Sequence, residues 1–302
     1  MENEFAHPAA LDLLARIKAS FQSDNIFQKK ESPILFVCGG PVSDGDRTLR
    51  KRFIEWANKA LPEIVIILAE RAFRETHFHT PPEIVNLAKF EALIADISDG
   101  VVIFPESVGS FAEVGYFSGI RGIRQKTLIV NDLNYQAKDS FANLGPIKTI
   151  DSDSFLQYAL YLDPEDPNFD HVGERLNRML ERKHRKRFRY GSYKTLNYLE
   201  KLLVVLELIN ILRIASVDGL LFAVRRVFDS ANSTDLKHLV SILLATGHVR
   251  REHEFLTMAD DAQSLLEFEN TRIEHLMVSA TLYHMKYQPT MFSLLRANNH
   301  AA

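Results

Sequence analysis

The chain has 302 residues, of which 46% are hydrophobic and 25% charged, and its formal net charge is −3. This composition is ordinary for a folded globular protein and excludes collagen-like, disulfide-stapled and mostly disordered classes. The length favours two domains, and the single cysteine, Cys38, excludes an intramolecular disulfide and favours a reducing, cytoplasmic location. We expect no signal peptide and no membrane span, because charged residues interrupt the most apolar stretch, 196–217.

The first half of the chain alternates strand and helix patterns. Short β-branched runs predict strands at Ile34–Gly40, Glu63–Glu70, Gly100–Ser107 and Lys126–Asp132, with Pro146–Ile150 as a candidate fifth. Helical periodicity predicts helices at Leu49–Ala60, Pro82–Ile97 and Ser110–Ile120, and a leading helix, Ala9–Phe21, packed outside the sheet. This alternation predicts an α/β fold with a doubly wound parallel sheet, of the flavodoxin-like kind.

The charge pattern changes after the predicted sheet. Residues 151–174 are acidic and contain no Lys or Arg, and a basic run follows at Arg182, Lys183, Arg185, Lys186, Arg187 and Arg189. The turn-rich sequence DPEDPN lies in the acidic part. We therefore predict a catalytic domain over residues 1–155, a linker over 156–192 and a second domain over 193–302.

The second half is predicted to be mostly helical. Its helical patterns run over Leu196–Ala215, Gly219–Phe228 and Thr234–Thr246, and Gly247 is a candidate C-cap. Two short strands, His248–Arg250 and Phe255–Met258, flank a charged turn. Helix, glycine, strand, charged turn and strand in this order are typical of a winged helix, and the alternative is a generic helical domain with a hairpin.

Two features fall at the carboxyl ends of predicted strands, where open parallel sheets bind ligands. Cys38, Gly39 and Gly40 follow the first strand, and the glycines either let the backbone approach a ligand or form a turn only. The chain has no GxGxxG motif and no Walker loop, which weighs against dehydrogenases and P-loop proteins. Its histidines have no metal-ligand spacing, so no metal and no resident cofactor are expected.

The second feature is FPESVGSFAEVGYFSG, residues 104–119, in which a loop through Gly109 leads to a helix predicted to open at Ser110. Glu113 then lies on the first helical turn. One interpretation is a capping box, in which Glu113 reaches back to Ser110. The other is a carboxylate aimed at the ligand crevice and able to attack an electron-poor carbon. Spacing alone favours the cap.

The segments ILFVCGG, FEALIADISDGVVIFPES, GSFAEVGYFSG and SFANLGP resemble the nucleoside 2-deoxyribosyltransferase-like fold. More closely, they resemble accessory effector proteins of bacterial retrons, which join such a domain to a C-terminal winged-helix DNA-binding domain. The resemblance is specific at residues 34–40, 91–119 and 140–146, and only architectural beyond about residue 190. It implies that Glu113 is the nucleophile at the sugar's anomeric carbon. It further implies substrate contacts, which we list together with the loop residues beside them: Glu91, Asp99, Glu106, Ser107, Gly109, Ser110 and Asn143.

The resemblance also implies an activity. Family members of this kind cleave an N-glycosidic bond, and for the retron effectors this is the nicotinamide bond of NAD, which is the substrate and not a cofactor. It implies a toxin restrained by the retron reverse transcriptase and its RNA–DNA hybrid, the msDNA, with higher-order assembly possible. Two alternatives stay open. One is a nucleotide-sensing DNA-binding regulator without catalysis. The other is a nucleoside monophosphate phosphoribohydrolase, whose PGGxGTxxE signature has glycines where this chain has Glu106 and Ser107.

The basic run is the predicted nucleic-acid contact. It is interleaved with Phe188, Tyr190 and Tyr193, and phosphate neutralisation combined with aromatic stacking is typical of nucleic-acid binding. The alternative is a solvated linker helix. Arg250 and Arg251, near His253, are predicted to lie on the projecting turn of the hairpin and to contact the nucleic-acid backbone.

Overall fold

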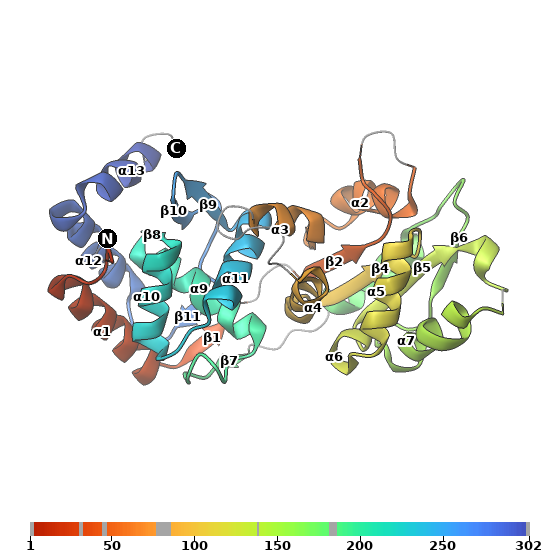
Figure 1. Cartoon of the computed structure of the whole chain (residues 1–302), viewed down its shortest axis with the longest axis horizontal. Coiled ribbons are helices and arrows are strands. Elements are labelled where there is room, and N and C mark those ends of the chain that lie inside the picture. The colour runs from red at the N-terminus through yellow and green to blue at the C-terminus, as the bar shows by residue number, and fades with distance from the viewer. Residues whose placement is uncertain are drawn as a thin grey trace. The chain divides into compact units, whose positions relative to one another are not determined.

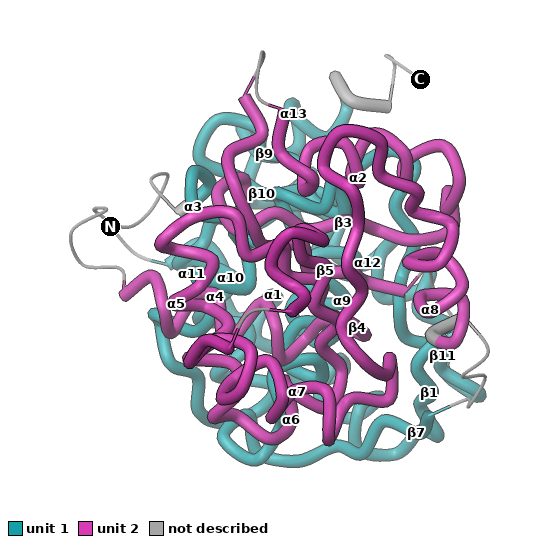
Figure 2. The backbone as a smooth tube through the Cα atoms, turned by 90° about the vertical axis from the view of Figure 1, so that its right-hand side faces the viewer, with its two compact units in different colours: residues 1–31, 72–84, 184–302 teal, residues 32–71, 85–183 magenta. Residues whose placement is uncertain are grey.

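The computed structural model describes residues 3–29, 33–43, 47–76, 86–137, 139–180 and 186–299. The chain forms two compact units, each made of separate stretches of sequence (Figure 2). The sheet unit comprises residues 32–71 and 85–183, and the helical unit comprises residues 1–31, 72–84 and 184–302. Within the described residues, no helix has the length and apolar character that crossing a bilayer requires.

The sheet unit is built on five parallel strands in the order β3-β2-β4-β5-β6. The strands are β2 (Ile34–Cys38), β3 (Val65–Ile67), β4 (Gly100–Ile103), β5 (Thr127–Asp132) and β6 (Leu160–Leu162). Leu35 of β2 pairs with both Ile66 of β3 and Gly100 of β4, which places β2 between these two strands. The predicted parallel α/β sheet is therefore confirmed, with four of its five strands where the sequence predicted them.

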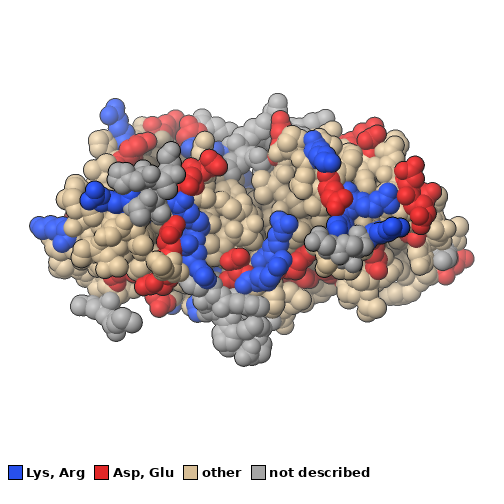
Figure 3. Space-filling view, turned by 90° about the horizontal axis from the view of Figure 1, so that it is seen from above, with Lys and Arg blue, Asp and Glu red and all other residues tan. Residues whose placement is uncertain are grey.

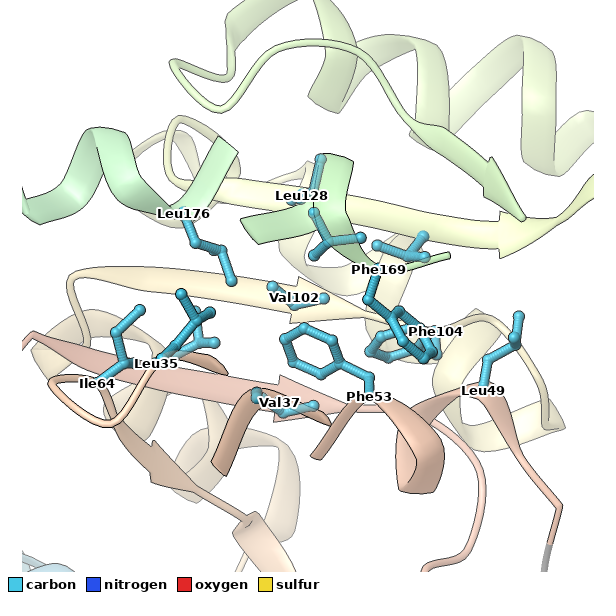
Figure 4. Packing of buried hydrophobic residues seen from close by; sticks show 14 of the residues in the cluster. Leu35, Val37, Leu49, Phe53, Ile64, Val102, Phe104, Leu128, Phe169 and Leu176 are labelled. Carbon is cyan, nitrogen blue, oxygen red and sulfur yellow. The ribbon is translucent and has the colours of Figure 1, made fainter. Parts of the chain in front are cut away.

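Helices cover both faces of this sheet. Helices α2 (Leu49–Ala60) and α8 (Asp170–Leu180) bury Phe53 and Leu176 against Val37, Val102 and Leu128 on one face (Figure 4). Side chains alternate along a strand, so the neighbouring residue Phe36 points to the other face. There it contacts Phe117 of helix α5 (Val108–Ser118), with ring centroids 6.3 Å apart. Helix α4 (Leu87–Ile97) packs on β2 as well, so a strand buried on both faces explains its continuous apolar run.

The predicted fifth strand is wrong. Residues 146–150 are helical, divided between the π-helix η3 (Asn143–Ile147) and helix α7 (Lys148–Asp153). Ile147 and Ile150 are buried and three residues apart, which is a helical spacing that the short run disguised. The fifth strand is β6, and it and α8 fall within residues 156–192, which the sequence assigned to a linker. The unit also contains α6 (Arg121–Arg124) and the 3-10 turn η2 (Leu133–Tyr135), whereas α3 (Ala69–Thr76) begins in it.

The helical unit is arranged around α9 (Tyr198–Leu212), which is buried along nearly its whole length (Figure 1). The other helices are α1 (Pro8–Ser23), α10 (Val217–Phe228), α11 (Ser233–Ala245), α12 (Ile273–Tyr287) and α13 (Pro289–Asn299). The leading helix α1 packs against α10 and α12, not outside the parallel sheet as predicted. Its Phe21 meets the rings of Phe188, Phe228 and Phe268 edge-on, so the apolar face of α1 completes the core of this unit.

Two small antiparallel sheets complete the helical unit. One has the order β11-β1-β7, from Leu266–Phe268, Ile26–Gln28 and Arg187–Phe188. The other has the order β8-β10-β9, from Ile214–Ser216, Phe255–Met258 and Val249–Glu252. The predicted order of a helix, Gly247 and two strands is confirmed, and Gly247 has the left-handed φ of 74° that a glycine adopts without strain. The helix predicted to run to Ala215 ends at Leu212, and its last residues form β8.

Candidate functional site

The candidate site lies where the strand order of the sheet reverses. From the central strand β2, the chain continues first to β3 on one side and then to β4 on the other. Ligands of doubly wound sheets bind at the carboxyl edge beside such a reversal, because the loops there diverge. The residues at this edge are Cys38, at the end of β2, and the segment that follows β4.

Gly39 and Gly40 allow the start of helix α2 to approach this edge closely. A Cβ on Gly39, whose φ is +154°, would lie 2.9 Å from Cβ of Phe104 and 3.0 Å from the side chain of Arg50. A Cβ on Gly40 would lie 2.8 Å from Cγ2 of Thr48. The glycines are therefore required by packing, and contact of their backbone with a substrate stays a prediction.

Arg50, in the first turn of α2, is buried beneath this edge. Its guanidinium donates hydrogen bonds to the carbonyls of Gly40, at 3.1 Å, and Val37, at 2.9 Å. It also forms an ion pair with Glu70 of α3, with Nη2 and Oε2 2.9 Å apart. A buried guanidinium needs such acceptors because its desolvation is costly. The result is a fixed positive charge beside the end of β2.

Two carboxyl groups from different helices meet at the same place. Glu91 of α4 and Glu113 of α5 are half-buried, and their side chains are hydrogen-bonded to each other. Burial raises the pKa of each to about 7; the charge of Glu70 raises the pKa of Glu91 further, and the charge of Glu91 raises that of Glu113. The nearby guanidinium of Arg50 lowers both pKa values. Two acids with pKa near neutrality can exchange a proton under physiological conditions.

Cys38 completes this cluster. Its thiol is buried, and burial together with the charges of Glu113 and Glu91 raises the pKa of that thiol well above its usual range. The neutral thiol donates a hydrogen bond to the carboxylate of Glu113, which lowers the pKa of that acid. Oε2 of Glu113 is buried and has no hydrogen-bond partner among the described residues. The acid is thus held in place while one of its oxygens is unoccupied.

The predicted capping box between Ser110 and Glu113 is wrong. Helix α5 begins at Val108 and its N-cap is Ser107, whose Oγ accepts a hydrogen bond from the backbone N–H of Ser110 at 3.2 Å. Oγ of Ser110 accepts from the N–H of Ser107 at 2.9 Å, which closes a box of two serines. The helix starts one residue before Gly109, so Glu113 lies in its second turn and not its first. The serines satisfy the helix terminus, and Glu113 has no capping role.

The other predicted substrate residues make structural contacts. Glu106 accepts hydrogen bonds from the backbone N–H groups of Gly40, Leu49 and Arg50, so its carboxylate holds the N-terminus of α2. Asp99 lies at the amino end of β4, across the sheet from Glu113, and accepts from the N–H of Ile34 at 2.8 Å.

Asn143 lies in η3, which packs against α5, and its Nδ2 donates to the carbonyl of Tyr135 at 2.8 Å. The structure therefore brings Cys38, Glu91 and Glu113 together, whereas Asp99 stands apart from them. Among the residues described, no three His, Cys, Asp or Glu side chains are grouped so that they could hold a metal ion.

The sequence analysis missed Arg50 and Glu70. Arg50 stands in the run Leu-Arg-Lys-Arg, and nothing local distinguishes it from its exposed neighbours. The one available signal was its distance from the glycines, because an arginine in the first turn of a helix that follows Gly39-Gly40 can reach back beneath the strand end. Glu70 had been placed at the end of a predicted strand, whereas it belongs to helix α3.

The basic run belongs to the helical unit where it is described. Arg182, Lys183 and Arg185 lie outside the described residues, whereas Lys186, Arg187 and Arg189 are exposed at and beside strand β7. The predicted aromatic stacking surface is wrong. Phe188 and Tyr193 are buried in the core, and the hydroxyl of Tyr190 donates to the carbonyl of Val227 at 2.6 Å. These rings point inward because β7 pairs with β1, so only the cations of the run face the solvent.

The hairpin also differs from its prediction. Arg250 and Arg251 lie within strand β9, and the turn consists of His253 and Glu254. Arg250 is paired with Asp260, at 2.6 Å, and with Glu252, at 3.3 Å. On the face drawn in Figure 3, Lys and Arg side chains are likewise interspersed with Asp and Glu. The charge of Arg250 is therefore balanced within the hairpin itself.

Residues 46–251 match the family model described as STM3845 retron effector protein. The chain belongs to this retron effector family. Two Escherichia coli relatives carry the names "Retron Ec73 putative ribosyltransferase/DNA-binding protein", 32% identical over 132 residues, and "Retron Ec86 putative ribosyltransferase/DNA-binding protein", 29% identical over 116 residues. The matched stretches cover 42% and 38% of this chain and 42% and 36% of the two relatives, less than half of each.

Proposed function

We propose that this retron effector is an N-glycosidase that releases nicotinamide from NAD, with Glu113 as its nucleophile. The observation that carries the proposal is the hydrogen-bonded pair of Glu91 and Glu113, both with pKa near 7, at the carboxyl edge of the sheet where the strand order reverses. The names of the two relatives support a reaction at a ribosyl group. The fold proposed for the sheet unit is that of the nucleoside 2-deoxyribosyltransferases.

In the proposed reaction, a carboxylate oxygen of Glu113 attacks the anomeric carbon of the ribose. The bond between this carbon and the nicotinamide nitrogen breaks, and its electron pair leaves with the ring. Nicotinamide is cationic while it is attached, so it departs neutral and needs no proton. The unoccupied Oε2 of Glu113 is the atom available for this attack. Water then adds to the anomeric carbon and releases Glu113 as a carboxylate and ribose as a free sugar end.

Glu91 is assigned to the proton in the second step. The attacking water must lose a proton, and a carboxylate with a pKa near 7 is suited to accept it. In inverting glycosidases, two carboxyls stand roughly 6.5–9.5 Å apart to hold a water between them. The hydrogen bond between Glu91 and Glu113 leaves no such space, which favours a covalent intermediate on Glu113 over direct attack by water.

The test is direct incubation of the purified protein with NAD, followed by chromatography of the products. Wild type is expected to release nicotinamide, and Glu113→Gln is not. Glu55→Gln is the matched control, because Glu55 is an exposed glutamate of the same unit. Nucleoside monophosphates and deoxynucleosides are tested in parallel. Cleavage of one of these and not NAD would replace the proposed substrate, and binding without any cleavage would favour the nucleotide sensor.

For the helical unit we propose nucleic-acid binding, supported by the words DNA-binding in the relatives' names. The order of helices and the three strands β8-β10-β9 is compatible with a winged helix. Lys186, Arg187 and Arg189 are exposed cations without an acidic run beside them, and we assign them to backbone phosphates. The proposed partners are the retron reverse transcriptase and its msDNA, which would hold the enzyme inactive as a cytoplasmic toxin.

This part is tested by the salt dependence of msDNA binding. Replacing Lys186, Arg187 and Arg189 with Ala should weaken binding and flatten the log–log salt slope by about 0.7–0.9 for each phosphate that is no longer neutralised. Arg250→Gln is the control, because Arg250 is already paired with Asp260 and Glu252. An unchanged slope in the triple variant would assign the tether to protein contacts with the reverse transcriptase instead.

A further inference from the structure

The ion pair of Arg50 and Glu70 lies beside the two carboxyls that the proposed reaction uses. Arg50 is 5% exposed, and its guanidinium is fixed by the carbonyls of Val37 and Gly40 at the end of β2. Nη2 holds Oε2 of Glu70 at 2.9 Å. A guanidinium tied to two carbonyls cannot move without losing these hydrogen bonds, so Glu70 is held at a set position as well.

Glu70 acts unequally on the two acids. Among the charged neighbours of Glu91 its effect is the largest, and among those of Glu113 it is the smallest. Glu113 in turn receives the hydrogen bond of the Cys38 thiol, which favours its ionised form. The negative charge of Glu70 therefore opposes a second negative charge on Glu91 more strongly than one on Glu113.

We propose that Arg50 and Glu70 are positioning residues that keep the one proton shared by the carboxyl pair on Glu91 and leave Glu113 as the anion. Glu113 is then ready to act as the nucleophile, and Glu91 becomes a base only after the leaving group has departed. The consequence for catalysis rests on the proposed function, whereas the position of the proton exists without any substrate. Arg50 supplies the positive charge that lets the pair hold one negative charge inside the unit.

Other charged groups on the neighbouring elements have partners of their own. Glu106, after β4, is bonded to backbone amides at the start of α2. Arg124 of α6 is paired with Asp153 at 2.6 Å, and Arg121 is exposed. The described groups that face Glu113 are accordingly Cys38, Arg50, Glu70 and Glu91.

The single cysteine of the chain provides a readout that does not depend on activity. The infrared S–H stretching band arises from Cys38 alone, and its frequency falls when the acceptor, Glu113, becomes an anion. In the wild type, titration without substrate should move the band as the pair loses its first proton. Arg50→Met should move the midpoint to higher pH by about one unit, because a neighbouring cation is removed. Glu70→Gln should split the band in the singly protonated state, because the proton is then shared between Glu91 and Glu113.

Arg52→Met is the matched control. Arg52 stands on the same helix and also donates to backbone carbonyls, those of Pro164 and Glu165, but it is remote from the acid pair. It should leave the band and its titration unchanged. Circular dichroism checks that each variant folds. If Arg50→Met does not fold, Glu70→Gln still tests the proposal, since Glu70 is partly exposed and its substitution is isosteric.

A wild-type band that does not titrate, or a folded Glu70→Gln variant with the wild-type band, would overturn the proposal. A kcat/KM profile against NAD adds the catalytic consequence. The acid limb should move to higher pH in Arg50→Met and stay in place in Arg52→Met. A protein that gives the expected titration but cleaves no NAD would refute the proposed function alone, and the assignment of the proton would stand.

Discussion

Glu113 in the sheet unit and Glu207 in the helical unit are both buried acids, and burial raises the pKa of each to about 7. Their neighbours differ. Glu207 stands on the buried helix α9, where Nδ2 of Asn210 donates to it at 3.3 Å and Oγ of Ser264 donates to its other oxygen. Glu113 stands beside a second acid, an arginine and a thiol, and its Oε2 has no partner within the described part of the chain.

This difference separates a structural acid from a reactive one. Both oxygens of Glu207 are occupied by neutral donors, so it fixes the segment around Ser264 and can bind nothing else. The charges around Glu113 come from four elements that meet at the strand ends, and they control its protonation without occupying it. A raised pKa alone marks burial, and only the surrounding groups decide whether the acid does chemistry.

The largest expected effect is loss of cleavage in Glu113→Gln. An amide cannot attack as an anion, so the rate of NAD cleavage should fall by at least about 10³-fold. The thermal midpoint at pH 8 should be unchanged or higher, because the substitution removes a buried charge that lies near Glu91. Cleavage at the wild-type rate would contradict the assignment of the nucleophile.

The second effect concerns stability. The pKa of Glu207 is raised from 4.5 to about 7 on folding, so its contribution is complete at pH 4 and is lost as the pH rises through 7. Glu207→Gln should therefore be more stable than wild type at pH 8 by about 3 kcal/mol, and the difference should shrink toward pH 5. Urea unfolding at the two pH values measures it, with the exposed Glu254→Gln as control. An equal difference at both pH values would argue against a buried, titrating Glu207.

The third prediction uses pH on the wild type. Ionised Glu113 is needed for attack, and its pKa is about 7, so kcat/KM for NAD should fall by about tenfold for each unit below pH 6. The contribution of Glu207 to stability changes in the opposite direction over the same range. Activity that is flat from pH 5 to pH 8 would contradict the ionisation assigned to the pair.

The smallest effect is expected for Ser107→Ala. This removes one side of the serine box at the N-terminus of α5 and should lower stability by about 1 kcal/mol, because the N–H of Ser110 loses its acceptor. Cleavage of NAD should remain within about twofold of wild type, because Glu113 lies a turn and a half further along the helix. A large loss of activity with intact folding would give the loop a direct role in binding the substrate.

The sequence by itself determined the alternation of strands and helices in the sheet unit, because a strand covered on both faces must be apolar along its whole length. It also determined the hairpin after α11, since Gly247 and the charged turn mark its ends. Glu91 and Glu113 were found through resemblance, whereas spacing alone favoured a helix cap at Glu113. That cap is formed by Ser107 and Ser110, because the helix begins earlier than its periodicity indicated.

Only the tertiary structure decided which charges matter. Arg50 and Glu70 are separated by 20 residues, and their ion pair exists because α2 and α3 both begin at the same edge of the sheet. The aromatic residues of the basic run looked available for stacking, but pairing of β7 with β1 turns Phe188 into the core. Arg250 looked like a free cation until the fold placed Asp260 beside it. In each case the deciding partner is remote in sequence, and local patterns carry no information on contacts of that kind.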